Sequence, residues 1–384
     1  MIATRNQAYP LNVTGGVNPF HEIEHFDKSS STLSVTSNNY HCCDQLHPNM
    51  ELLNDETASF ENSTHSSMRA YENEADILNA YYAFIHPYLP LLPPPAVPQY
   101  EDRPVIIRIQ NANFPPPREQ VVPHWPVSPL SLALSAILVL IPPPGDISHA
   151  HKTALRGEYS EIYASSALES VERDIELLRL TPRTGVSGTN LSQPVRRPLH
   201  PNVQLELESI LALVTLCTYE YCQRGNISKM RFRANQAVTT AMDMSLHDLG
   251  KEAIETSESQ RRAWWMTMYM AYFSSVLNVS PPIISADDPR ITTPYPQFLV
   301  PLEPWPLVLK AQQALFTTAE MLKDLEAGSD GLQILSEGNF DELNTYIQSL
   351  VVESDRPLPV VNRQKAESSA AEGIWIIARI LIHT

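Results

Sequence analysis

One segment near the N-terminus has the spacing of a zinc-protease motif. His21, Glu22 and His25 fit the pattern His-Glu-x-x-His. On a helix this spacing brings both histidines to one metal ion and holds the glutamate beside the bound water as a general base. The surrounding residues have no amphipathic helical period, and so short a pattern also arises by chance. We therefore interpret the segment as part of a solvated polar tail.

The four cysteines offer two further candidate metal sites, and neither has favourable spacing. Residues 41–43 read His-Cys-Cys, and His47 follows them. Adjacent cysteines suit a tetrahedral zinc ion poorly, because zinc sites usually separate their cysteines. Cys217 and Cys222 lie in a segment of helical period, where we interpret them as small buried hydrophobic side chains. We expect no metal ion and no cofactor in this chain.

An aromatic cluster between residues 257 and 280 is a candidate binding site. Its rings could line a pocket for a small-molecule effector, or they could form the packed core of a helix. Aromatic side chains at helical spacing are more often core, and we favour that interpretation. The cluster comprises Trp264, Trp265, Tyr269, Tyr272 and Phe273.

Three polar residues accompany the aromatic cluster. Arg261 and Arg262 lie in the predicted first turn of a helix, where the helix dipole disfavours cations. We expect them to pair with carboxylate or carbonyl groups or to face solvent, and we favour a structural ion pair over an anion-binding site. His247 lies near the end of the preceding helix, where a protonated imidazole would act as a cap. Because no phosphate loop, nucleophile elbow or paired carboxylate site is visible, we predict that the protein is not an enzyme.

Charge and hydropathy restrict the partners of the chain. Its 384 residues include 43 acidic and 27 basic side chains, which give a net charge of -16 at pH 7. Unaided DNA binding requires clustered Lys and Arg, and no basic run occurs, so we predict no direct nucleic-acid binding. The apolar run at 130–141 is shorter than the roughly 20 residues that span a bilayer. With no secretory signal visible, we expect a soluble, intracellular protein without membrane contact.

Hydrophobic periodicity predicts an all-α fold, an array of packed helix pairs with long Pro-rich connections. Residues 1–72 are polar and aperiodic, and we predict that they form a disordered tail ahead of a helical domain at residues 73–384. We find no convincing strand alternation. Gly225 is expected just past one helix, and Ser257 with Gln260 has the spacing of a capping box. Helices are predicted at about 76–85, 129–141, 158–180, 204–222, 229–246, 257–280, 307–325, 341–352 and 368–384.

Several of these segments follow the order found in one protein family. The segment DILNAYYAFIHPYLPLL (76–92) is an apolar helix that ends in His-Pro, and SPLSLALSAILVL (128–140) is a second apolar helix. The most specific part is Leu246-His247, a variable loop, and then the Arg-Arg-x-Trp-Trp motif at 261–265. An acidic and proline-containing segment follows at 287–296. Residues 76–384 therefore resemble the middle homology region of fungal binuclear zinc-cluster (Zn2Cys6) transcription factors.

The chain departs from the family pattern at several positions. Ser245 stands where the family usually has glycine before Leu-His, and residues 279–281 read Val-Ser-Pro in place of Gly-Arg-Pro. An aspartate that is common in the family is missing near Ala271. The DNA-binding head of the family needs six cysteines that hold two zinc ions, and this chain has only four cysteines.

The resemblance implies a nuclear transcription regulator whose helical domain responds to effectors or protein partners. Zinc and DNA binding would belong to the head, which is either missing from the gene model or supplied by a full-length zinc-cluster factor that pairs with this chain. Other transcription proteins are further candidate partners. The resemblance also implies truncation of the domain at its C-terminus. The alternative is a helical module that binds proteins or small molecules and makes no DNA contact.

Overall fold

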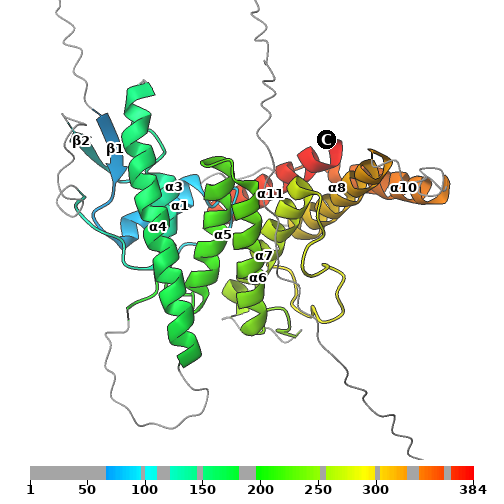
Figure 1. Ribbon diagram of the computed structural model, residues 1–384, viewed down its shortest axis with the longest axis horizontal. Helices are drawn as coiled ribbons and strands as arrows, with labels where there is room; N and C mark the ends of the chain where they lie inside the picture. Colours follow the sequence, from blue (N-terminus) through cyan, green and yellow to red (C-terminus); the bar gives the residue numbers. More distant parts are fainter. Residues whose placement is uncertain are drawn as a thin grey trace, which may run out of the picture. The chain divides into compact units, whose positions relative to one another are not determined.

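The computed structural model describes residues 66–96, 100–109, 122–144, 150–180, 196–250, 257–298, 303–326, 337–358 and 365–384. In this part of the chain it contains nine helices and one two-stranded sheet (Figure 1). The predicted all-α fold is therefore confirmed. The predicted tail up to residue 65 lies outside the described residues, and so do the zinc-protease pattern and the histidines and cysteines at 41–47.

The sheet corrects the prediction that the chain has no strands. β1 (Ser66–Ala70) pairs antiparallel with β2 (Val105–Ile109), and Met68 lies opposite Ile107. β1 also lies inside the segment that was predicted to be a tail. The sequence of β1, SSMRA, has no apolar alternation, and β2 is a short apolar run in a Pro-rich stretch. Five-residue strands of this kind give no reliable period, because the pairing itself supplies most of what stabilises them.

Each predicted helix has a counterpart, and the differences are at the ends. α4 begins well before residue 158, and α6 ends before residue 246 because the backbone at Ser245 is left-handed. The helices are α1 (Glu74–Phe84), α3 (Pro129–Leu138), α4 (Ala150–Leu180), α5 (Leu207–Cys222), α6 (Ile227–Asp243), α7 (Ser257–Asn278), α8 (Pro304–Glu326), α10 (Glu337–Ser354) and α11 (Ala366–His383).

Local capping sets several of these ends. The Ser128 hydroxyl accepts a hydrogen bond from the Ser131 backbone N–H, and the Ser131 hydroxyl accepts one from the Ser128 backbone N–H. This reciprocal pair is a capping box, and it starts α3. Gly225 has φ +60° just past α5, as predicted. The capping box predicted at Ser257 and Gln260 stays a prediction: Ser257 is the first residue of α7, and the Gln260 amide nitrogen donates to Gln204.

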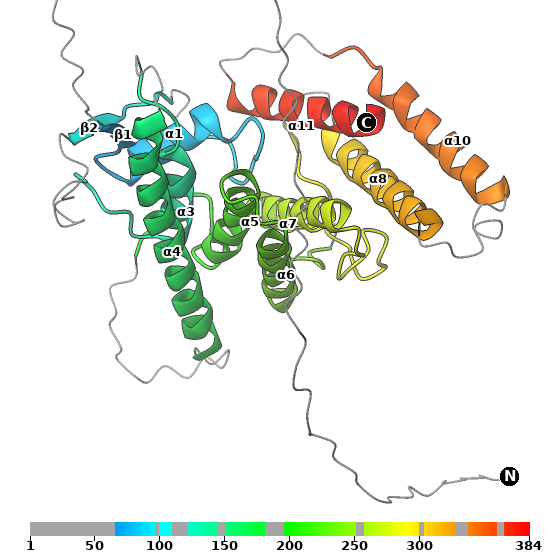
Figure 2. The same ribbon diagram turned by 45° about the horizontal axis from the view of Figure 1, so that its top comes forward.

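α7 is the central helix of the array. It is buried over most of its length. It packs against α5, α6 and α8, and these neighbours are seen around it in Figure 2. α8 in turn packs against α10 and α11, while α3 packs against α1, α4 and α5. None of the described helices has the length and apolar character that a membrane crossing needs.

Candidate functional site

Arg262, on α7, is the centre of a buried polar network. Its side chain is 1% exposed. Its Nε donates to Glu258 Oε1 at 2.9 Å, one turn earlier on the same helix. Its Nη2 and Nη1 donate to the two carboxylate oxygens of Glu367, on α11, at 2.6 and 3.2 Å. Such a two-pronged contact is among the stronger hydrogen-bonding arrangements in proteins. The ion pair expected for Arg262 is thus present, and Arg261 contacts the second oxygen of Glu258 at 3.4 Å.

A histidine extends the network toward α1. His86 Nε2 lies 3.1 Å from Glu367 Oε1, and His86 Nδ1 lies 2.9 Å from the Tyr81 hydroxyl. Both His86 and Tyr81 are fully buried. A neutral imidazole that carries its proton on Nε2 donates to the carboxylate, and its Nδ1 then shares the single Tyr81 hydroxyl proton with the Leu89 carbonyl, which lies 3.0 Å from that hydroxyl. His86 therefore orients Glu367 toward Arg262.

Two backbone carbonyls complete the shell around the guanidinium. Arg262 Nη1 donates to Leu92 O at 2.9 Å, and Nη2 donates to Gln297 O at 3.3 Å. The Gln297 backbone N–H donates in return to Glu258 at 3.2 Å. One side chain on α7 thereby joins the chain that follows α1, the segment before α8 and the start of α11.

Burial and charge together set the protonation states of the network. Burial lowers the pKa of His86 below its usual 6.5, so the imidazole is neutral. Burial alone would raise the pKa of Glu367, but the hydrogen bond from His86 and the charge of Arg262 outweigh it and hold that pKa below 4.5. For Glu258 burial outweighs Arg262, so its pKa is raised. The network consists of a buried cation, its carboxylates and a neutral histidine, all engaged with one another.

Residues 287–298 form a strap across the first half of α7, with a turn at 289–290 and no regular secondary structure from 291 on. Trp265 Nε1 donates to Pro294 O at 2.9 Å, and the Trp265 and Tyr295 rings lie 4.2 Å apart. At the end of the strap the Arg262 guanidinium lies 5.3 Å from the centre of the Phe298 ring. Both Trp265 and Arg262, from the Arg-Arg-x-Trp-Trp motif, therefore hold this strap in place.

The Leu-His turn is joined to the same strap. The His247 carbonyl accepts from the backbone N–H groups of Thr292 and Thr293 at 2.9 and 3.2 Å. The Thr293 hydroxyl donates to Leu246 O at 2.6 Å and accepts from Leu249 N at 3.1 Å. His247 was predicted to cap a helix through its imidazole. Its bonds to the strap instead run through its carbonyl, while its Nδ1 is buried without a hydrogen-bond partner.

The aromatic cluster lies inside the helical array. Trp264 is fully buried and its ring lies 5.9 Å from that of His247, while Trp265 is only 3% exposed. The Tyr272 hydroxyl accepts from Ala286 N at 2.8 Å, and Tyr269 is buried. Phe273 is partly buried and packs against the same core. This burial accords with the interpretation of the rings as helix-packing core.

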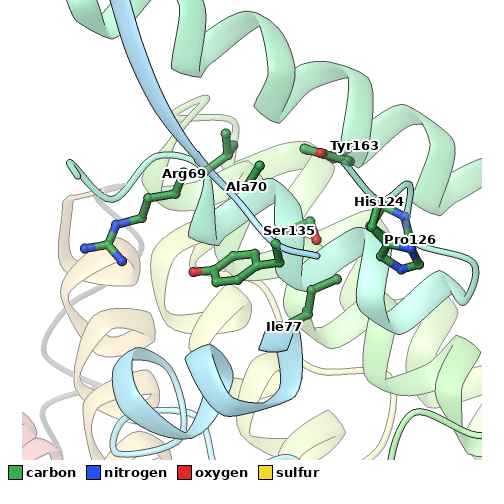
Figure 3. A pocket seen from close by; sticks show the side chains of 9 residues that line it. Arg69, Ala70, Ile77, His124, Pro126, Ser135 and Tyr163 are labelled. Atoms are coloured by element: carbon green, nitrogen blue, oxygen red, sulfur yellow. The ribbon is translucent and has the colours of Figure 1, made fainter. Parts of the chain in front are cut away.

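A small pocket lies apart from these residues, beneath β1 (Figure 3). Its volume is about 10 Å³, which is room for about one water molecule. In Figure 3 the Arg69 guanidinium points away from the other labelled side chains, and it bonds to Asp102 and to a backbone carbonyl. Ser135 Oγ is buried without a hydrogen-bond partner, and His124 Nε2 lies 3.7 Å from Glu74 Oε1. The pocket is too small for an organic effector.

The described cysteines are free thiols. Cys217 is fully buried, and burial raises its pKa, so it behaves as a small apolar side chain. Cys222 is exposed and therefore differs from the interpretation as buried. Within the described ranges no group of three or more His, Cys, Asp or Glu residues is placed to hold a metal ion.

The network includes residues that the sequence did not single out as site residues. Glu258 and Glu367 are acids in the first turns of their helices, a position where acids are common because they complement the helix dipole. Their sequence positions alone therefore gave no sign of burial. The His-Pro at 86–87 was noted only as a helix end. The one available signal was the need of Arg262 for a partner.

Two departures from the resembled family coincide with unusual backbone. Ser245 has φ +60° and Val279 has φ +44°, and they are the non-glycine residues with positive φ in the described part of the chain. At both positions the family pattern has glycine, which adopts this conformation without steric cost. A β-branched residue such as valine is strained there.

Comparison with family models, curated proteins and solved structures found no match to this chain.

Proposed function

We propose that this chain is the regulatory domain of a fungal-type zinc-cluster transcription factor and that it acts in the nucleus through protein contacts. The proposal rests on one observation: the segments that carry the family resemblance lie together around Arg262 and Trp265. The His-Pro after α1, the Leu-His turn, the Arg-Arg-x-Trp-Trp motif and the segment at 287–296 are far apart in sequence. Hydrogen bonds link them in sequence: His86 reaches Arg262 through Glu367, Trp265 donates to Pro294, and Thr292 and Thr293 donate to His247.

The backbone conformations add independent support. The family pattern has glycine before Leu-His and at the end of the next helix. Glycine suits both positions if their backbone is left-handed, because it adopts positive φ without steric cost. Ser245 and Val279 occupy those positions with positive φ.

The architecture favours a regulatory over a catalytic role. The titratable groups of the network are engaged with one another, and Arg262 and His86 are buried away from solvent. The aromatic rings are packed as core. We therefore propose that the response to other molecules takes place on the outer helix surfaces and that DNA is reached through a partner that carries a zinc-cluster head.

A reporter experiment tests this role. The full chain is fused to an unrelated DNA-binding domain and expressed with a reporter gene under that domain's operator. We expect the fusion to raise or lower transcription relative to the DNA-binding domain alone. An Arg262→Met fusion should lose the effect because its core network is broken, whereas Arg103→Met, at an exposed ion pair, should retain it. Equal transcription with and without the folded chain would overturn the proposal.

A gel-shift experiment tests the route to DNA. The purified chain is mixed with random duplex DNA at low salt, where electrostatic binding is strongest. With a net charge of -16 we expect no shifted band. A shifted band would show that the chain contacts DNA unaided and would refute the partner-based route.

A further inference from the structure

The exposed side of α6 carries a basic and aromatic patch on an otherwise acidic protein. Lys229, Phe232, Arg233 and Gln236 follow the spacing that places them on one helix face. Phe232 is 62% exposed, and the Arg233 guanidinium lies 5.3 Å from its ring centre. Aromatic side chains and arginine are enriched at the centres of protein interfaces, so Phe232 and Arg233 are candidate contact residues.

The cations of this patch make no close ion pair, although the charge of Lys229 contributes to lowering the pKa of Glu161. The neighbouring carboxylates Glu161 and Glu220 both pair with Arg224. Arg233 contacts the amide of Gln236 instead. Among the described residues, neither Lys229 nor Arg233 takes part in an ion pair of 4 Å or less. The patch therefore keeps an excess of positive charge that an acidic surface could complement.

α10 has the complementary character. It contains four acidic residues and no lysine or arginine. Its outer side has a shallow depression lined by Asp341, Glu342, Thr345, Tyr346 and Ser349. Val352, at 74% exposure, adds apolar area to the same side of the helix. α10 packs against α8 and α11, whereas α6 packs against α5 and α7, so the two surfaces lie on different elements.

We infer that these two surfaces bind each other between copies of this chain. Phe232 of one copy would lie against Tyr346 of the next, with Lys229 and Arg233 facing Asp341 and Glu342. Because the two surfaces differ, the contact is head-to-tail, and it leaves one surface of each kind free at the ends of a chain of copies. This self-association is independent of the proposed role in transcription.

Sedimentation velocity of the full chain tests the inference. We expect the average mass to rise with protein concentration at low salt and to fall in about 0.5 M salt, since the paired charges are screened. Lys229→Glu with Arg233→Glu should weaken association by about tenfold or more, and so should Asp341→Lys with Glu342→Lys. Phe232→Ser removes the anchor without changing charge and should also weaken association. Melting curves would verify that each variant is folded.

Mixing the charge variants gives the decisive result. In an equimolar mixture the intact surface of each double variant meets the intact partner surface of the other, and the two reversed surfaces again carry opposite charges, so the mixture should associate although each variant alone does not. Combining all four reversals in one chain should restore self-association. Three results would overturn the pairing of α6 with α10. The wild-type chain could be monomeric at every concentration, association could be unchanged in both double variants, or association could be lost in only one of them. If reversal of the α6 charges abolishes binding to random duplex DNA and leaves self-association unchanged, the patch is a nucleic-acid site. That result would also refute the pairing of α6 with α10.

Discussion

Gly373 of α11 lies directly against the backbone of Pro87. A Cβ atom built on Gly373 would lie 1.9 Å from the Pro87 carbonyl oxygen. This approach brings α11 close enough to the end of α1 for Glu367 to reach His86. A glycine inside a helix costs about 1 kcal/mol relative to alanine, so its presence here is explained by the contact that it permits.

Gly373→Ala should therefore destabilise the protein. The added methyl group forces α11 away from Pro87, and we expect the free energy of unfolding to fall by about 1–3 kcal/mol in chemical denaturation. Gly157→Ala is the matched control, because the nearest atom to its Cβ would be Gln223 Nε2 at 3.9 Å. That substitution should be neutral or stabilising by up to about 1 kcal/mol. Equal effects of the two substitutions would contradict the close approach.

Arg262→Met alone should lower the free energy of unfolding strongly, and the added substitution Glu367→Leu should reduce that loss. Alone it leaves the Glu367 carboxylate buried without its cation, with an expected loss of about 3–5 kcal/mol in unfolding free energy. In the double variant Arg262→Met with Glu367→Leu, no unpaired charge remains at that contact, so the loss should be clearly smaller than the sum of the single losses. Additive losses in this double-mutant cycle would show that the two groups are not coupled.

Thr293→Val should loosen the strap from the Leu-His turn. It removes the hydroxyl that donates to Leu246 O and accepts from Leu249 N. Because these groups are partly or fully buried, the free energy of unfolding should fall by about 1–3 kcal/mol. Thr239→Val makes the same change on the exposed side of α6 and should have little effect. Thermal unfolding compares the two, and limited proteolysis should show earlier cleavage in residues 287–298 of Thr293→Val alone.

Val279→Gly should stabilise the protein. The backbone at Val279 has φ +44°, where glycine is relieved of the side-chain clash, and we expect a gain of about 1 kcal/mol. Val276→Gly lies inside α7 and should have the opposite sign, since it removes packing and helix propensity. If both variants lose stability in denaturant titrations, the strain at Val279 is absent.

Acidification should destabilise the protein through its buried histidines. Burial lowers the pKa of His200 to about 4 and that of His86 below 6.5. The unfolded chain takes up these protons below pH 6.5 and the folded chain does not, so stability is present above pH 6.5 and decreases toward pH 4. His200→Gln should reduce the loss between pH 7 and pH 5 by about 1–2 kcal/mol. An unchanged pH dependence in this variant would show that His200 titrates normally.

Some features of the fold were accessible from the sequence because they depend on neighbouring residues. Apolar residues at helical spacing located the nine helices, and Gly225 marked the end of one of them, because both signals arise within a few turns of chain. The helix dipole disfavours an unpaired cation in the first turn of α7, and this local rule indicated correctly that Arg262 needs a partner.

The identity of that partner depended on the tertiary structure. Glu367 is 105 residues from Arg262, and nothing near it distinguishes a buried acid from the many that complement a helix dipole in solvent. The pairing of β1 with β2 and the use of the His247 carbonyl have the same origin. The sequence by itself determined which segments become helices, since that depends on local periodicity. Only the packing of those helices decided which polar groups meet, because burial and hydrogen-bond partners are properties of segments far apart in the chain.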